Sequence, residues 1–151
     1  MLRSALALAV VALVLVGCRR PAMPSGSWRD PLTGTRLALA ARGKHPYLKD
    51  HERVLFVESP TGQVRRVQLY PCAGYPVHSN LYRLPGDRLL LVDANGVWTT
   101  VAPTGEIESR RCCWGKQLPG DFLGVFQADV EQRYRLALGT EPEIYIFKDP
   151  P

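Results

Sequence analysis

The chain has 151 residues, a formal net charge of +5 and 46% hydrophobic residues. This length is enough for one domain with a hydrophobic core of its own. The lysines and arginines are scattered along the chain instead of forming a run, which argues against a nucleic-acid-binding protein. A modest basic excess of this kind fits contact with anionic lipid or glycan, and it fits solubility equally well.

The amino-terminal segment is apolar but short. Arg3 is followed by a run from Ala5 to Val16 that contains only Ala, Leu and Val. Such a run falls short of the roughly 20 residues of a membrane-spanning helix and matches the apolar part of a secretory signal peptide. It ends in the sequence LVGC at residues 15–18, which resembles the lipobox of bacterial lipoproteins.

This resemblance implies that Cys18 carries lipid. In that family the cysteine thiol receives a diacylglycerol, the signal peptide is cut just before the cysteine, and the new amino group is usually acylated. Several acyl chains form a durable anchor, because each buried CH₂ contributes about 0.8 kcal/mol. The resemblance thus predicts a lipid-anchored protein of the cell envelope, and Arg19 implies the outer membrane, facing the periplasm, in a Gram-negative cell. The alternative is a plain signal peptide or an uncleaved helix in which Cys18 has no role.

The chain is expected to divide into three parts. These are a signal peptide over 1–17, the lipidated cysteine with a flexible tether over 18–35, and a single β-domain over 36–151. Prolines and glycines interrupt the tether, and no apolar period runs through it. Trp28, near its end, is expected to dock on the domain or at the lipid interface.

Turn residues recur at short intervals after residue 36. Ser59-Pro60-Thr61-Gly62 and Pro103-Thr104-Gly105 suit bulged type I hairpin turns, as does Ala94-Asn95-Gly96, and Pro85-Gly86 suits a type II turn. The runs between them are about five residues long, a normal strand length. Residues 89–92 are apolar on both faces and predict a central strand covered on both sides, and residues 124–149 predict another two or three strands.

The sequence therefore predicts an all-β domain, an antiparallel meander of short strands with no long helix apart from the signal peptide. The meander would form a sandwich, a small barrel or a propeller-like sheet. The segments ESPTGQV and VAPTGEI repeat about 43 residues apart, a spacing that propeller blades also show. The chain is too short to close a propeller, and recurrence of a favourable turn explains the repeat equally well.

Four cysteines are present, and lipidation of Cys18 would leave three. An oxidising compartment favours a disulfide from Cys72 to either Cys112 or Cys113, while a bond between the two adjacent cysteines is rarer. A metal site built from these three with His78 is the less favoured alternative, because the spacing matches no known ligand pattern. The remaining histidines, His45 and His51, are expected to lie on the surface without a role.

Two pairs of arginines each follow a Pro-Thr-Gly turn. They either form a basic patch for an anionic partner or, as the favoured interpretation, protect edge strands from pairing with other chains. Several aromatic residues lie near the cysteines in sequence and are typical interface anchors. The candidate binding face comprises Arg65, Arg66, Tyr70, Tyr75, His78, Tyr82, Arg110, Arg111 and Trp114.

No nucleophile motif, glycine-rich phosphate loop or paired-carboxylate pattern is present in the sequence. We therefore expect no catalytic activity, no cofactor and no bound metal. The leading hypothesis is a lipid-anchored envelope protein whose β-domain binds another envelope protein or supports envelope structure, with no nucleic-acid partner. The alternatives are a periplasmic inhibitor or immunity-type lipoprotein and, ranked lower, a metal or redox carrier.

Overall fold

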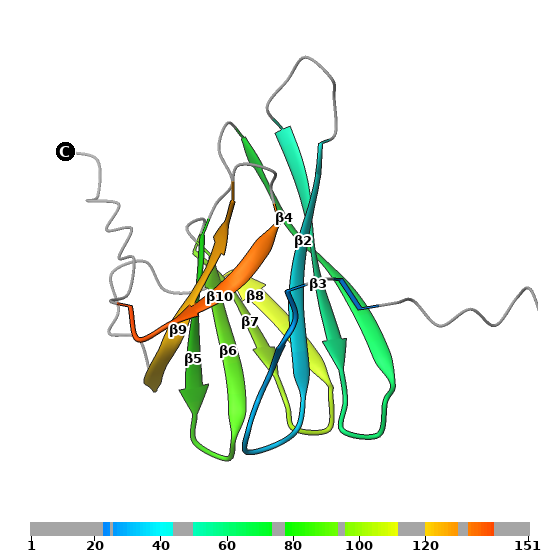
Figure 1. The fold of residues 1–151 in the computed structure, drawn as a ribbon, viewed down its shortest axis with the longest axis vertical. Coiled ribbons are helices and arrows are strands. Elements are labelled where there is room, and N and C mark those ends of the chain that lie inside the picture. Colours follow the sequence, from blue (N-terminus) through cyan, green and yellow to red (C-terminus); the bar gives the residue numbers. More distant parts are fainter. Residues whose placement is uncertain are drawn as a thin grey trace, which may run out of the picture.

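The structure is a computed structural model that describes residues 23–24, 26–43, 50–73, 78–93, 96–111, 120–129 and 133–140. The described part of the chain forms ten β-strands in two antiparallel sheets (Figure 1). The four-stranded sheet has the order β1-β2-β3-β4, with bounds Trp28–Arg29, Arg36–Gly43, Asp50–Glu58 and Val64–Ala73. The six-stranded sheet has the order β10-β9-β5-β6-β7-β8, with bounds Tyr134–Leu138, Asp121–Ala128, Ser79–Leu84, Arg88–Asp93, Val97–Val101 and Ile107–Arg111.

The prediction of an all-β fold with short antiparallel strands is confirmed, and the described residues contain no helix. Consecutive strands pair from β2 to β4 and from β5 to β8, as in a meander. The meander is interrupted twice: β5 begins the second sheet instead of pairing with β4, and β9 pairs with β5 rather than with β8. This leaves β8 as an edge strand. Of the strands predicted over 124–149, β9 and β10 are two, and a third would fall outside the described residues.

The Pro-Thr-Gly segments form the predicted hairpin turns, and they form them in the same way. Gly62 has a φ of 81° and donates its N–H to the Ser59 carbonyl, while Gly105 has a φ of 84° and donates to the Ala102 carbonyl. Both turns lie at the lower end of the fold in Figure 1. They also touch, since a Cβ placed on Gly105 would lie 3.0 Å from the Cβ of Ser59.

The strand over residues 89–92 is central and buried on both faces, as predicted. It lies within β6, which has β5 on one side and β7 on the other. Leu89 and Leu91 belong to the core between the sheets, whereas Leu90 packs with Tyr82 and Trp98 on the opposite face. All three leucines are only 1% exposed.

The main core lies between the inner faces of the two sheets, so the fold is a two-layer sandwich, one of the arrangements predicted. Its buried members come from both sheets: Leu37, Leu39, Leu55, Val57, Leu69, Leu81, Leu89, Leu91, Val101, Phe126 and Tyr134. Trp28 packs against this core, which confirms that it docks on the domain. The packed part of the chain thus begins inside the range 18–35 that the sequence predicts as a tether.

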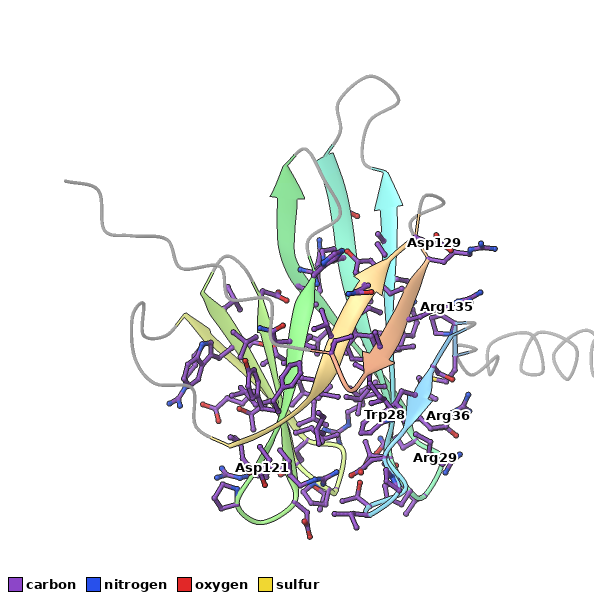
Figure 2. The ribbon with its side chains drawn as sticks, turned by 60° about the vertical axis from the view of Figure 1, so that its left-hand side comes forward. Trp28, Arg29, Arg36, Asp121, Asp129 and Arg135 are labelled. Carbon is purple, nitrogen blue, oxygen red and sulfur yellow. The ribbon has the colours of Figure 1, made fainter. Side chains whose placement is uncertain are left out.

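A backbone bridge joins the two sheets along one side, and along the other side no backbone pairing joins the described strands. Ala40 of β2 forms an isolated antiparallel bridge with Arg133, directly before β10. Figure 2 shows Trp28, Arg36 and Arg135 on this joined side. The strands at the far ends of the two sheets are β4 and β8. Both strands that carry the arginine pairs are therefore edge strands, as the favoured interpretation predicts.

Candidate partner-binding edge

The strand β4 is ten residues long, and no described strand pairs with its outer side. The Ser59 N–H donates to the Gln63 carbonyl and closes a hydrogen-bonded pair at the start of the ladder between β3 and β4. Bonded and non-bonded pairs alternate along an antiparallel ladder. Counting from this pair, Val64, Arg66 and Gln68 fall in non-bonded pairs with β3. Their backbone N–H and C=O groups therefore point to the open side.

Two exposed guanidinium groups lie on this edge. Arg65 lies opposite Val57, which faces the core, and Arg66 lies opposite Phe56, which faces outward. Consecutive residues of a strand point to opposite faces, so the two arginines lie on the two sides of the sheet. Both are exposed, and neither forms an ion pair or a side-chain hydrogen bond with the described residues. No acidic residue occurs in β4.

The second arginine pair lies on the edge of the other sheet, at a different distance from its hairpin turn. Arg110 and Arg111 end β8, opposite Trp98 and Val97 of β7. Arg110 is exposed, but it shares its short strand with the exposed Glu108. The pair on β4 lies near its turn, whereas the pair on β8 lies at the end away from its turn. The two arginine pairs therefore define two edges rather than one basic patch.

The other residues of the predicted binding face have different outcomes. Tyr70 and Cys72 lie on β4, and the backbone of Cys72 is opposite His51. His78 precedes β5 and is partly buried. Tyr82 is only 3% exposed and packs edge-on against Phe122, with ring centroids 5.4 Å apart, so it belongs to the packing of the sheet instead of an exposed face. The predicted residues that lie outside the described part of the chain are Cys18, Tyr75, Cys112, Cys113 and Trp114.

One polar cluster inside the sandwich was missed by reasoning from sequence. Arg53 of β3 is 0% exposed, and its Nη1 lies 3.2 Å from Oδ1 of Asp93 at the end of β6. The Ser79 hydroxyl donates to the same Asp93 oxygen at 2.6 Å and accepts a hydrogen bond from Nη2 of Arg53. The guanidinium also lies over the Tyr134 ring, 5.5 Å from its centroid. This cluster joins the two sheets through charge rather than through apolar packing.

A signal for the buried arginine exists in the sequence. Arg53, Leu55 and Val57 occupy alternate positions of one strand, so all three face the same way. That pattern places a charged residue on the core face. A buried arginine requires an anionic partner, because an unpaired charge in the interior is strongly unfavourable.

A second buried ion pair lies at the lower end of the fold, between the turn after β1 and strand β5. Asp30 is 0% exposed and accepts two hydrogen bonds from Arg83, at 2.6 and 3.2 Å. Burial raises the pKa of Asp30, but the hydrogen bonds from Arg83, Thr33 and the Leu32 N–H, with the charge of Arg83, outweigh it and leave the pKa below 3.8. The hydrogen bond to Asp30 likewise raises the pKa of Arg83. This pair is ionised at neutral pH and fixes the first hairpin to the second sheet.

Within the described residues, no three His, Cys, Asp or Glu side chains are grouped so that they could hold a metal ion. Nor does the described part contain a helix with the length and apolar character to span a membrane. Comparisons with protein-family models, with curated proteins and with solved structures found no match to this chain.

Proposed function

We propose that this protein is a lipid-anchored protein of the cell envelope whose β-domain binds another envelope protein without catalysing a reaction. The LVGC sequence at residues 15–18 supports the anchor, with Cys18 as the acylated residue. In a Gram-negative cell, Arg19 after the cysteine supports the outer membrane, facing the periplasm. The domain would then act close to the membrane surface.

The distance from the membrane follows from the length of the tether. Trp28, the first residue of β1, lies ten positions after Cys18. A fully extended chain spans at most about 3.3–3.6 Å per residue, so the domain would lie within roughly 35 Å of its anchor. Partners within reach are therefore proteins of the same membrane or of the space beside it.

The observation that carries the binding proposal is the open edge of β4, where backbone hydrogen-bonding groups and two exposed arginines lie together. Unpaired edge strands associate readily with other chains, and proteins that keep them exposed either protect them or use them. A domain tethered to a membrane gains from such an edge, because the tether raises the local concentration of partners in that membrane.

Acylation is tested with the variant Cys18→Ser in cells labelled with a palmitate analogue. We expect the variant to stay as the uncleaved precursor and to take up no label, because the modified sulfur is absent. Cys72→Ser is the matched control and should be processed and labelled like the wild-type protein. Unchanged processing and labelling of Cys18→Ser would refute the anchor.

Partner binding is tested by cross-linking in intact cells, followed by purification of the protein from detergent-solubilised envelopes. We expect a defined envelope protein in a fixed ratio to this chain. A periplasmic hydrolase or toxin as the single partner, inactive in the complex, would instead establish the inhibitor function. Recovery of this chain alone would contradict partner binding.

A further inference from the structure

The edge of β4 has a limited usable length. It begins at Val64, directly after the turn, and contains Pro71 near its other end. Proline has no backbone N–H, and in sheets it occurs on edge strands where that group is not needed. The ladder with β3 is also irregular between His51 and Arg53, opposite this part of β4. The regular open edge therefore extends over residues 64–69, which we term the β4 edge.

The β4 edge combines a backbone template with one sign of charge. Val64, Arg66 and Gln68 present their N–H and C=O groups, and Arg65 and Arg66 present positive charge on both faces of the sheet. A strand added here would bring its own side chains about 4.5–5.5 Å from those of β4, measured between Cβ atoms. Opposite charges at such positions are favourable, and like charges are unfavourable.

The other edges of the described sheets lack this combination. The five-residue strand β8 carries both Glu108 and Arg110, so its charge is mixed. The strand β10 has only five residues, and the bridge between Arg133, directly before it, and Ala40 ties this edge to β2. The strand β1 has only two residues.

The charge also discriminates between possible occupants of the β4 edge. A second copy that paired antiparallel in the register centred on Arg66 would place the two Arg66 side chains opposite each other and the two Arg65 side chains at diagonal positions. That arrangement would be repulsive. The arginines therefore protect against self-association and at the same time favour an acidic strand, since specificity rests on rejecting one partner as well as on attracting another.

We propose that the β4 edge binds an extended acidic segment of a partner protein, which adds to the four-stranded sheet as a fifth strand. Because Arg65 and Arg66 lie on opposite faces, the complementary segment carries two consecutive acidic residues. Val67 and Leu69, on the inner face, favour apolar residues nearby in that segment. This inference rests on the proposed function, and it specifies the chemistry of the partner.

The test uses the mature protein purified from membranes in detergent and a synthetic peptide, acetyl-Thr-Val-Glu-Glu-Val-Thr-Val-amide, with a fluorescent label. We expect binding by fluorescence anisotropy that weakens as salt concentration rises. A peptide with Gln-Gln in place of Glu-Glu should bind at least tenfold more weakly. Equal binding of the two peptides, or no binding of the acidic one, would overturn the proposal.

Two variants test the two parts of the recognition. Arg65→Glu/Arg66→Glu removes the charge complementarity, and Gln68→Pro removes an outward N–H without changing charge. Each should weaken binding of the acidic peptide at least tenfold, whereas Arg110→Glu on the other edge should leave it within twofold of the wild-type value. A far-ultraviolet circular dichroism spectrum identical to that of the wild-type protein establishes that each variant is folded.

The same variants separate this inference from the proposed function. If Arg65→Glu/Arg66→Glu cross-links to the same envelope partner as the wild-type protein, the β4 edge is not the binding site although partner binding stands. If the wild-type protein has no partner and Cys18 is not acylated, the proposed function itself fails. A wild-type dimer in sedimentation, together with failure to bind the peptide, would overturn the inference in favour of a second copy.

Discussion

Asp30 and Arg83, which are 53 residues apart in the sequence, form a two-point ion pair that ties the first hairpin to the six-stranded sheet. The shorter contact, from Nη2 of Arg83 to Oδ1 of Asp30, is 2.6 Å, and the Asp30 side chain has no exposed surface. Thr33 and the Leu32 N–H complete the shell of donors around the carboxylate. The amino-terminal hairpin of the described domain is therefore fixed at its first turn.

We expect Asp30→Asn to destabilise the domain by about 3 kcal/mol, the lower end of the range for breaking a buried pair, because Arg83 keeps some access to water. The free energy of unfolding, from urea denaturation followed by tryptophan fluorescence, measures the loss. Asp87→Asn is the control, since Asp87 lies 4.0 Å from the same guanidinium but is 59% exposed. It should cost less than about 1 kcal/mol, and equal losses would show that burial of Asp30 adds nothing.

The same pair predicts a dependence of stability on acid. The pKa of Asp30 lies below 3.8 in the folded protein, so its carboxylate is easier to protonate in the unfolded chain. The contribution of the pair is therefore complete above the unfolded pKa and is lost as the pH falls through the folded value. The difference in free energy of unfolding between wild type and Asp30→Asn should stay constant from neutral pH to about pH 5 and shrink below about pH 4. A difference that stays constant down to about pH 2 would contradict this linkage.

The turns and strands were predictable because their causes are local. Gly62 and Gly105 have positive φ angles, which the Pro-Thr-Gly sequences require at those positions. The edge position of β4 was also open to prediction, because two consecutive arginines are tolerated only where both faces of a strand reach water. In both cases, a few residues that are adjacent in the sequence are enough to predict the structure.

The two buried ion pairs depend instead on how the sheets stack. Alternation in β3 indicates that Arg53 faces the core, but it does not identify Asp93 or Ser79 as the groups that meet it. Likewise, the Pro- and Gly-containing segment around Asp30 indicates a turn, and Asp30 does lie in one. The sequence does not indicate that its carboxylate contacts Arg83. These contacts depend on how segments far apart in the sequence are aligned when the two sheets stack. No pattern of neighbouring residues predicts that alignment.

The contact between the two hairpin turns predicts unequal effects of equivalent glycine substitutions. Gly62→Ala should cost about 1–2 kcal/mol, the penalty of a left-handed conformation, because no atom lies within 4 Å of the new Cβ. Gly105→Ala has the same conformational cost, and it also places a methyl group 3.0 Å from the Ser59 Cβ. Overpacking of this kind adds about 1 kcal/mol or more. Urea denaturation of the two variants gives the difference, and equal costs would show that the turns do not press on each other.

The buried cluster around Arg53 predicts strong coupling between that residue and Asp93. Among the described residues, neither the Nε nor the Nη1 of Arg53 has a hydrogen-bond partner, and the same holds for Oδ2 of Asp93. The cluster is therefore held by few hydrogen bonds and by its opposite charges. Arg53→Met leaves the Asp93 carboxylate buried without its cation, and Asp93→Asn leaves the guanidinium without its anion. Each should cost about 3–5 kcal/mol.

The double variant Arg53→Met/Asp93→Asn removes both charges at once, so neither is left uncompensated. We expect its loss of unfolding free energy to be smaller than the sum of the two single losses by about 2 kcal/mol or more, which is the coupling expected of residues in direct contact. The four proteins of this cycle are compared by urea denaturation at one pH and one salt concentration. Additive losses would mean that the two charges do not stabilise each other.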